Sequence, residues 1–114
     1  MLPEVMALLN DIQKAANLAR KFVEGRSFDE YQTNDLLHSA VERKFRIVGE
    51  AMTQLRKRDP SLVQRFTDHR AIIAFRNLLD HGYAAIVHEK VWDILENKLP
   101  TLIVEVDAVM KAVT

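Results

Sequence analysis

The sequence of 114 residues contains no cysteine, which excludes disulfides, thiolate metal sites and cysteine nucleophiles. It also has no excess charge of one sign, because 16 basic residues balance 16 acidic residues. We therefore expect no molecule-wide field that gathers nucleic acid, and any anion site must depend on a local cluster. No apolar run is long enough to span a bilayer, and the first residues do not have the pattern of a signal peptide. These absences predict a cytoplasmic protein without a membrane partner.

Glycine and proline are scarce, with three of each, which leaves few points at which a helix would break. Apolar residues recur at helical spacing along nearly the whole chain, and the length suits one domain, residues 1–114. We expect an all-α, up-and-down bundle of four to five helices. The final helical stretch, which follows a connection at residues 81–88, should restart or kink at Pro100.

The second expected helix runs from about Asp29 to Arg58 and would be roughly 45 Å long. Gly25 should end the helix before it, and Ser27 or Asp29 should cap its start. Gly49 lies inside this helix, either as a tolerated defect or because another helix, from this chain or from a second subunit, approaches closely there. The apolar stripe of the helix is close to a heptad pattern and consists of Leu37, Val41, Phe45, Val48, Met52 and Leu55.

A later helix, from about residue 68 to 79, leads into the polar stretch "RNLLDHGY" at Arg76–Tyr83. Arg76 and His81 are five residues apart, about 140° around a continuous helix, so they would not converge on an unbroken one. Gly82 could end the helix and let His81 turn back toward Arg76, with Tyr83 beside them. An imidazole can transfer protons near neutral pH, and a guanidinium can bind a phosphate and stabilise its charge. Such a group suits metal-independent RNA cleavage, in which the ribose 2′-OH is the nucleophile.

The same residues also have simpler interpretations. Arg76 and Asp80 have the i,i+4 spacing of an ordinary helix-surface ion pair. His81 near a helix C-terminus is favourable to the helix dipole without any catalytic role, and Tyr83 could be a core aromatic. The spacing of one arginine and one histidine alone does not decide between these interpretations.

Four stretches resemble HepT-like toxins of the HEPN superfamily, and together they cover nearly the whole chain. The stretch "RNLLDHGY" fits the family pattern R-x4-H-x-Y. "AVERKFRIVGEAMTQL" (Ala40–Leu55) is similar to the long central helix of the family, and "VWDILENKLPTL" (Val91–Leu102) is similar to its W-x-I-x4-L-P segment. "LNDIQKAANLARKFVEGRSFDEY" resembles its N-terminal helix and turn.

This resemblance implies a ribonuclease that needs no cofactor and no metal, acting as the toxin of a toxin–antitoxin pair. It implies a homodimer whose contacts involve the long second helix and the motif region, so that the two motifs meet at a cleft. Arg76 would be the catalytic phosphate-binding residue and His81 the catalytic histidine. Tyr83 would be the tyrosine that an MntA-type nucleotidyltransferase antitoxin adenylylates. The alternative is a non-catalytic HEPN dimer that binds a nucleotide or a partner protein.

Several further residues are candidates for supporting roles. Asn77 and Asp80 belong to the motif stretch, and Asn77 could hydrogen-bond a base or a phosphate. Arg43 and Glu50 are seven residues apart, so they share a face of the long helix and could support the cleft or form an ordinary ion pair. Arg46 is predicted only as the i,i+4 partner of Glu42.

The remaining histidines are predicted to have no catalytic role. His38 and His88 show no ligand partners at metal spacing, and we assign them no metal. His69 occupies a position where HepT-like proteins often carry tryptophan, which could alter the edge of the pocket or only its packing.

Overall fold

The computed structural model describes residues 1–81 and 84–113, and within them every regular element is helical. Side chains at positions 80 and 84–86 also lie outside this description. The predicted all-α class is confirmed. The elements in chain order are α1 (Pro3–Phe22), α2 (Phe28–Thr33), α3 (Asp35–Arg58), α4 (Pro60–Val63), α5 (His69–His81), α6 (Ala84–Asp93), the π-helical turn η1 (Ile94–Lys98) and α7 (Leu99–Ala112).

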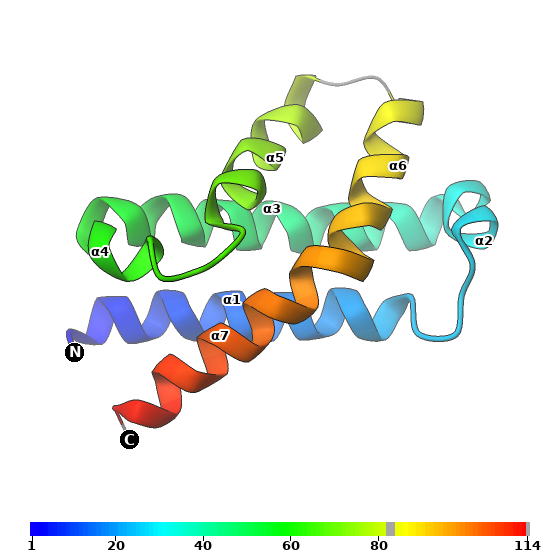
Figure 1. Cartoon of the computed structure of the whole chain (residues 1–114). Helices are drawn as coiled ribbons and strands as arrows, with labels where there is room; N and C mark the ends of the chain where they lie inside the picture. Colours follow the sequence, from blue (N-terminus) through cyan, green and yellow to red (C-terminus); the bar gives the residue numbers. More distant parts are fainter. Residues whose placement is uncertain (82–83, 114) are drawn as a thin grey trace.

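Helices α1 and α3 lie side by side and form the base of the bundle (Figure 1). The six stripe residues predicted for the long helix are all buried on α3, which confirms that stripe. Helix α7 packs across α1, while α5 packs on α3. No charged or polar residue is buried within the described part of the chain. Within the described residues, the charged side chains therefore lie at or near the surface.

The turn between α1 and α2 follows the prediction. Gly25 has φ of 73°, the left-handed conformation that glycine adopts without steric cost. Ser27 caps α2 through a capping box, in which its hydroxyl accepts a hydrogen bond from the Glu30 N–H and its own N–H donates to the Glu30 carboxylate. Of the two cap candidates, the structure selects Ser27.

The single helix expected from about Asp29 to Arg58 is wrong, because the chain breaks at Asn34. Asn34 has φ −104° and ψ 99°, and its side chain accepts a hydrogen bond of 3.0 Å from the Leu37 N–H. This N-cap starts α3 as a separate helix of 24 residues, with the six-residue α2 before it. Together with the short α4, the break explains why the described chain has more helices than the four to five expected.

The C-terminal stretch differs from the prediction at its start. Residues 81–88 were expected to form a connection, but α5 extends to His81 and α6 begins at Ala84. The predicted kink near Pro100 is confirmed, because the helix widens into η1 before α7 begins. Leu99 donates its N–H to the Ile94 carbonyl there, five residues back. Proline has no N–H to continue the regular ladder, and the wide turn accommodates that loss.

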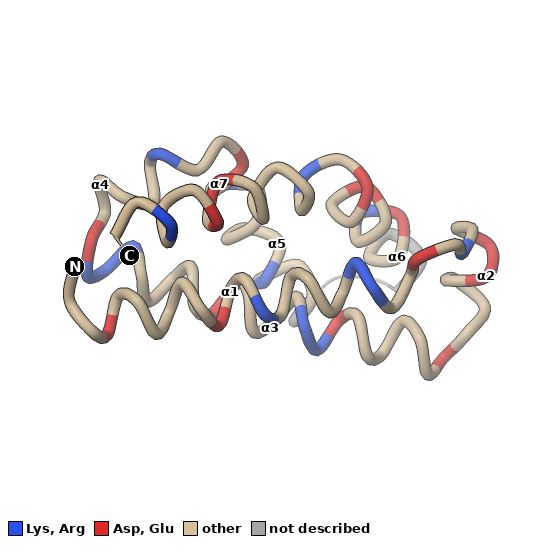
Figure 2. Tube along the Cα trace, turned by 90° about the horizontal axis from the view of Figure 1, so that it is seen from below, with Lys and Arg blue, Asp and Glu red and all other residues tan. Residues whose placement is uncertain are grey.

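None of the helices in the described chain is both long and apolar enough to cross a membrane. Figure 2 shows basic and acidic residues interspersed along the helices.

Candidate active site

Arg76 lies on α5 where this helix packs closely against Gly49 of α3. A Cβ atom built on Gly49 would lie 2.8 Å from the Cβ of Arg76, a distance that real Cβ contacts essentially never show. Of the two interpretations of Gly49, the close approach of another helix is confirmed, and that helix is α5 of the same chain. The missing side chain at position 49 is therefore what allows the motif helix to dock at Arg76.

The guanidinium of Arg76 pairs with the Glu50 carboxylate, with 2.7 Å between Nη2 and Oε2. The Glu50 side chain also accepts a hydrogen bond of 3.1 Å from Gln54 Nε2. Both members of the ion pair are substantially exposed, 36% for Arg76 and 48% for Glu50. Solvent screens such a pair, so it is worth about 0–1 kcal/mol at most. Glu50 thus orients the Arg76 guanidinium but binds it weakly, so an incoming phosphate can compete with Glu50 for it.

Arg46 of α3 holds the C-terminal end of α5. Its Nη2 donates a hydrogen bond of 3.3 Å to the backbone carbonyl of Leu79, two residues before His81. This bond ties α3 directly to the backbone of the last turn of α5. The sequence interpretation, which treated Arg46 only as a partner of Glu42, missed this contact. It depends on how α5 packs on α3, which spacing along one helix does not reveal.

His81 is exposed in the last turn of α5. Helix α5 is continuous from Arg76 to His81, so the two side chains leave the helix about 140° apart. The structure therefore does not show the predicted turn of His81 back toward Arg76. Gly82 and Tyr83 lie outside the described residues, as does the side chain of Asp80. Asn77 is described and exposed on α5.

A surface groove of about 320 Å³ adjoins Glu50, between α1 and α3. Arg43 and Glu50 both line it, which confirms that they share a face, and Arg46 lies between them. The volume is at the lower end of the range for small-ligand pockets. Asp11 from α1 contributes a second acidic side chain, so the lining carries both signs of charge. This groove connects the supporting residues of α3 to the Arg76 ion pair through Glu50.

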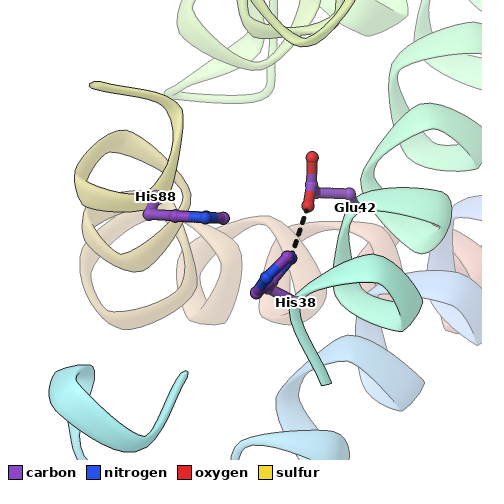
Figure 3. A group of neighbouring side chains, drawn as sticks. All are labelled: His38, Glu42 and His88. Atoms are coloured by element: carbon purple, nitrogen blue, oxygen red, sulfur yellow. Dashed lines mark hydrogen bonds and ion pairs between the residues drawn. The ribbon is translucent and has the colours of Figure 1, made fainter. Parts of the chain in front are cut away.

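A second polar cluster joins α3 and α6 and contains His38, Glu42 and His88 (Figure 3). His38 Nδ1 is 3.2 Å from Glu42 Oε2, and His38 Nε2 is 3.1 Å from Asp35 Oδ1. The rings of His38 and His88 have centroids 4.3 Å apart. The prediction that these histidines lack partners at metal spacing is wrong. The His38–Glu42 spacing of i,i+4 was visible in the sequence, whereas the contact with His88 depends on the packing of α6.

Aromatic residues enclose this cluster. The Tyr31 ring is completely buried and stands edge-on to the His88 ring, with centroids 5.6 Å apart. Neither the Tyr31 hydroxyl nor His88 Nδ1 has a hydrogen-bond partner among the described residues. Burial lowers the pKa of His88, and the neighbouring His38 adds to this effect. Burial also raises the pKa of the Tyr31 hydroxyl, with a further contribution from Glu42.

The fold and the site define a small all-α bundle with an Arg–His motif at the end of a surface helix. The chain belongs to the HepT-like family, because the family model described as "Ribonuclease HepT-like" matches residues 12–109. The chain is similar to two proteins of Methanocaldococcus jannaschii. One is named "Putative RNase MJ0127", with 28% identity over 110 residues that cover 95% of this chain and 88% of the relative. The other is named "Putative RNase MJ1380", with 28% identity over 110 residues that cover 93% of this chain and 96% of the relative. No solved structure matches the chain.

Proposed function

We propose that this protein is a metal-independent endoribonuclease and that it acts as the toxin of a HepT/MntA-type toxin–antitoxin pair. The observation that carries the proposal is the position of Arg76 in a chain of the HepT-like family. The Arg76 guanidinium is accessible and pairs with Glu50. The helix that carries Arg76, α5, packs closely against Gly49 of α3. Two relatives whose printed names call them RNases support the same class of reaction.

In the proposed reaction His81 removes the proton from a ribose 2′-OH. The 2′-oxygen forms a bond to the adjacent phosphorus, and the bond from phosphorus to the 5′-oxygen breaks. A proton from water or from a second imidazole neutralises the leaving 5′-oxygen, so the products are a 2′,3′-cyclic phosphate and a 5′-OH end. Arg76 leaves Glu50 and stabilises the additional negative charge on the phosphoryl oxygens. RNA supplies its own nucleophile, which is why the proposed scheme needs neither a metal nor a cysteine.

A homodimer completes the proposed site. Arg76 and His81 leave opposite sides of α5, so one chain does not present both to a single phosphate without rearrangement. Two copies that meet through α3 and the end of α5 would place two arginines and two histidines around one RNA-binding cleft. This arrangement follows the family resemblance, and the exposed ends of both side chains are compatible with it.

Regulation in this proposal falls on Tyr83, which lies outside the described residues. Adenylylation by an MntA-type nucleotidyltransferase would attach AMP to the phenol oxygen two positions after His81. The added phosphate would compete for the cations that bind substrate, and the nucleoside would obstruct the cleft. Inhibition then has a direct electrostatic and steric cause.

The proposal is tested by RNA cleavage with purified protein of verified unmodified mass, in excess EDTA. Circular dichroism confirms that the chain stays folded in the chelator. Arg76→Ala should reduce cleavage by about 10²–10³-fold or more, and His81→Ala by about 10²–10⁴-fold. Arg70→Ala, which removes an exposed arginine of α5 outside the motif, is the matched control and should retain cleavage.

The end groups of the product discriminate between mechanisms. Ends with 2′,3′-cyclic phosphate support the proposed attack by the 2′-OH. Cleavage that survives both catalytic variants would assign the activity to a contaminant. No cleavage of tRNA or mRNA by the unmodified, folded wild-type protein would instead favour the non-catalytic dimer that binds a nucleotide or a partner protein.

A further inference from the structure

We propose that His38, Glu42 and His88 bind one Zn²⁺ ion, which fastens α6 to α3 independently of RNA cleavage. The three residues offer one ligand atom each, and these atoms all lie within 4.8 Å of one another. Figure 3 shows the His88 ring extending from α6 toward the His38 and Glu42 side chains of α3. The proposed site shares no residue with the Arg76 and His81 motif.

The geometry on α3 already approaches that of a zinc site. Zinc–nitrogen and zinc–oxygen bonds of about 2.0–2.1 Å in a tetrahedron place neighbouring ligand atoms about 3.3–3.4 Å apart. His38 Nδ1 and Glu42 Oε2 are 3.2 Å apart, so one edge of the tetrahedron is formed. The i,i+4 spacing on one helix produces this edge without strain. His88 has to approach by a small side-chain rotation, and a water molecule would complete the coordination.

His38 lies between two carboxylates, with Nδ1 3.2 Å from Glu42 Oε2 and Nε2 3.1 Å from Asp35 Oδ1. In the proposed site the ion takes the place of a proton between Nδ1 and Glu42, and Nε2–H donates to Asp35. Histidines that bind metals usually donate their other N–H to a carboxylate or carbonyl, which sets the tautomer and the ring orientation. Asp35, His38 and the proposed ion would form such a carboxylate–histidine–metal unit.

The cluster also contains polar atoms whose hydrogen bonding is incomplete. His88 Nδ1 and the Tyr31 hydroxyl are buried without hydrogen-bond partners among the described residues. Unsatisfied buried polar groups are rare in native proteins, and an ion or water at the group is one explanation for them. A cation bound by His88, with a coordinated water beside Tyr31, would provide partners for this region. Tyr31 also packs against Trp92 of α6, with ring centroids 5.6 Å apart.

The donor set favours Zn²⁺ over Mg²⁺ and Ca²⁺. Two imidazoles and one carboxylate suit Zn²⁺, whereas Mg²⁺ and Ca²⁺ prefer sites built entirely from oxygen ligands. The ion would join α3 to α6, whose first residue follows His81 by three positions. We therefore expect the bound ion to stabilise the packing of α6 against α3.

The test is isothermal titration of Zn²⁺ into the full chain after EDTA treatment and removal of the chelator. Wild type should bind about one Zn²⁺ per chain and show a higher melting temperature with Zn²⁺ than without. His88→Gln and Glu42→Gln should weaken binding at least about 100-fold, and Asp35→Asn by about 10–100-fold as an outer-shell change. His69→Gln removes a histidine outside the cluster and should leave Zn²⁺ binding unchanged.

Co²⁺ provides a second readout, because four-coordinate Co²⁺ absorbs strongly in the visible range and six-coordinate Co²⁺ does so weakly. The strong band should appear with wild type and with His69→Gln, and should be absent with His88→Gln. Asp35 is 98% exposed, so Asp35→Asn keeps the proposal testable even if a cluster variant fails to fold. Absence of saturable Zn²⁺ binding by wild type, or equal binding by His88→Gln and wild type, would overturn the proposal.

Discussion

Gly49 and Arg76 mark a close approach between α3 and the motif helix, because a Cβ atom on Gly49 would lie 2.8 Å from the Cβ of Arg76. The obstructing atom belongs to the root of the arginine side chain, so a change of rotamer cannot move it away. The same stretch of α3 supplies Glu50, which pairs with the Arg76 guanidinium. Gly49 and Glu50, which are consecutive on α3, therefore set the position of α5 and the orientation of the Arg76 guanidinium.

Gly49→Ala should destabilise the protein even though alanine is the better helix former. Alanine gains about 1 kcal/mol of helix propensity, but overpacking of a tight contact costs about 1–3 kcal/mol. We expect the free energy of unfolding in urea to fall by about 1 kcal/mol, and RNA cleavage to fall because α5 shifts.

The matched test of this clash combines Gly49→Ala with a second change at position 76. Arg76→Ala retains the Cβ atom and should leave the destabilisation in place, whereas Arg76→Gly removes that atom and should relieve it. A gain in stability from Gly49→Ala alone would contradict the close approach.

Glu50→Gln should make Arg76 more available to RNA. The half-exposed ion pair competes with phosphate by at most about 1 kcal/mol, so affinity for single-stranded RNA should rise by up to about fivefold. Unfolding free energy should change by less than about 0.5 kcal/mol for the same reason. Fluorescence anisotropy with labelled RNA and the His81→Ala protein measures binding without cleavage.

Glu24→Gln is the control for this prediction, because it removes the same charge from an exposed position at the end of α1. If both variants raise the affinity equally, net charge is responsible and the ion pair with Arg76 is not. The gain from Glu50→Gln should also shrink in high salt, which screens exposed charges.

Arg46→Ala should loosen the last turn of α5 while leaving the bundle folded. It removes the hydrogen bond to the Leu79 carbonyl, and one such bond is worth about 0.5–1.5 kcal/mol net. Hydrogen exchange should accelerate at the end of α5 and remain unchanged in α1. If His81 acts as proposed, kcat should fall more than KM changes. Arg56→Ala, another exposed arginine of α3, should affect neither measurement.

Burial along α3 could be predicted from the sequence because it follows helical periodicity within one element. The apolar stripe from Leu37 to Leu55 is buried as expected. Caps with strong local chemistry, such as Ser27, were likewise identifiable. The Asn34 break was missed although threonine, asparagine and aspartate at positions 33–35 are weak helix formers and asparagine is a preferred N-cap residue. In the structure the Asn34 side chain caps the first turn of α3 by accepting from the Leu37 N–H.

Contacts between helices could not be predicted from spacing. The motif identified Arg76 and His81, but the Arg76–Glu50 pair depends on the crossing of α5 over α3. The sequence left two interpretations of Gly49, and only the packed structure identifies α5 as the neighbour. His88 illustrates the same limit, because its ring reaches His38 from a separate helix whose start was itself mispredicted.

Asn34→Ala tests whether the break between α2 and α3 is set by its cap. The Asn34 side chain accepts from the Leu37 N–H at 3.0 Å, and replacing such a cap by alanine costs about 0.5–2 kcal/mol. We expect the midpoint of urea unfolding to fall accordingly with an unchanged m-value. Asn34→Asp restores an oxygen acceptor and should recover most of the loss, whereas Gln32→Ala, at a nearby exposed position, should change little. If Asn34→Ala is as stable as wild type, the two helices are separated by packing on α1 and α6, and the cap is incidental.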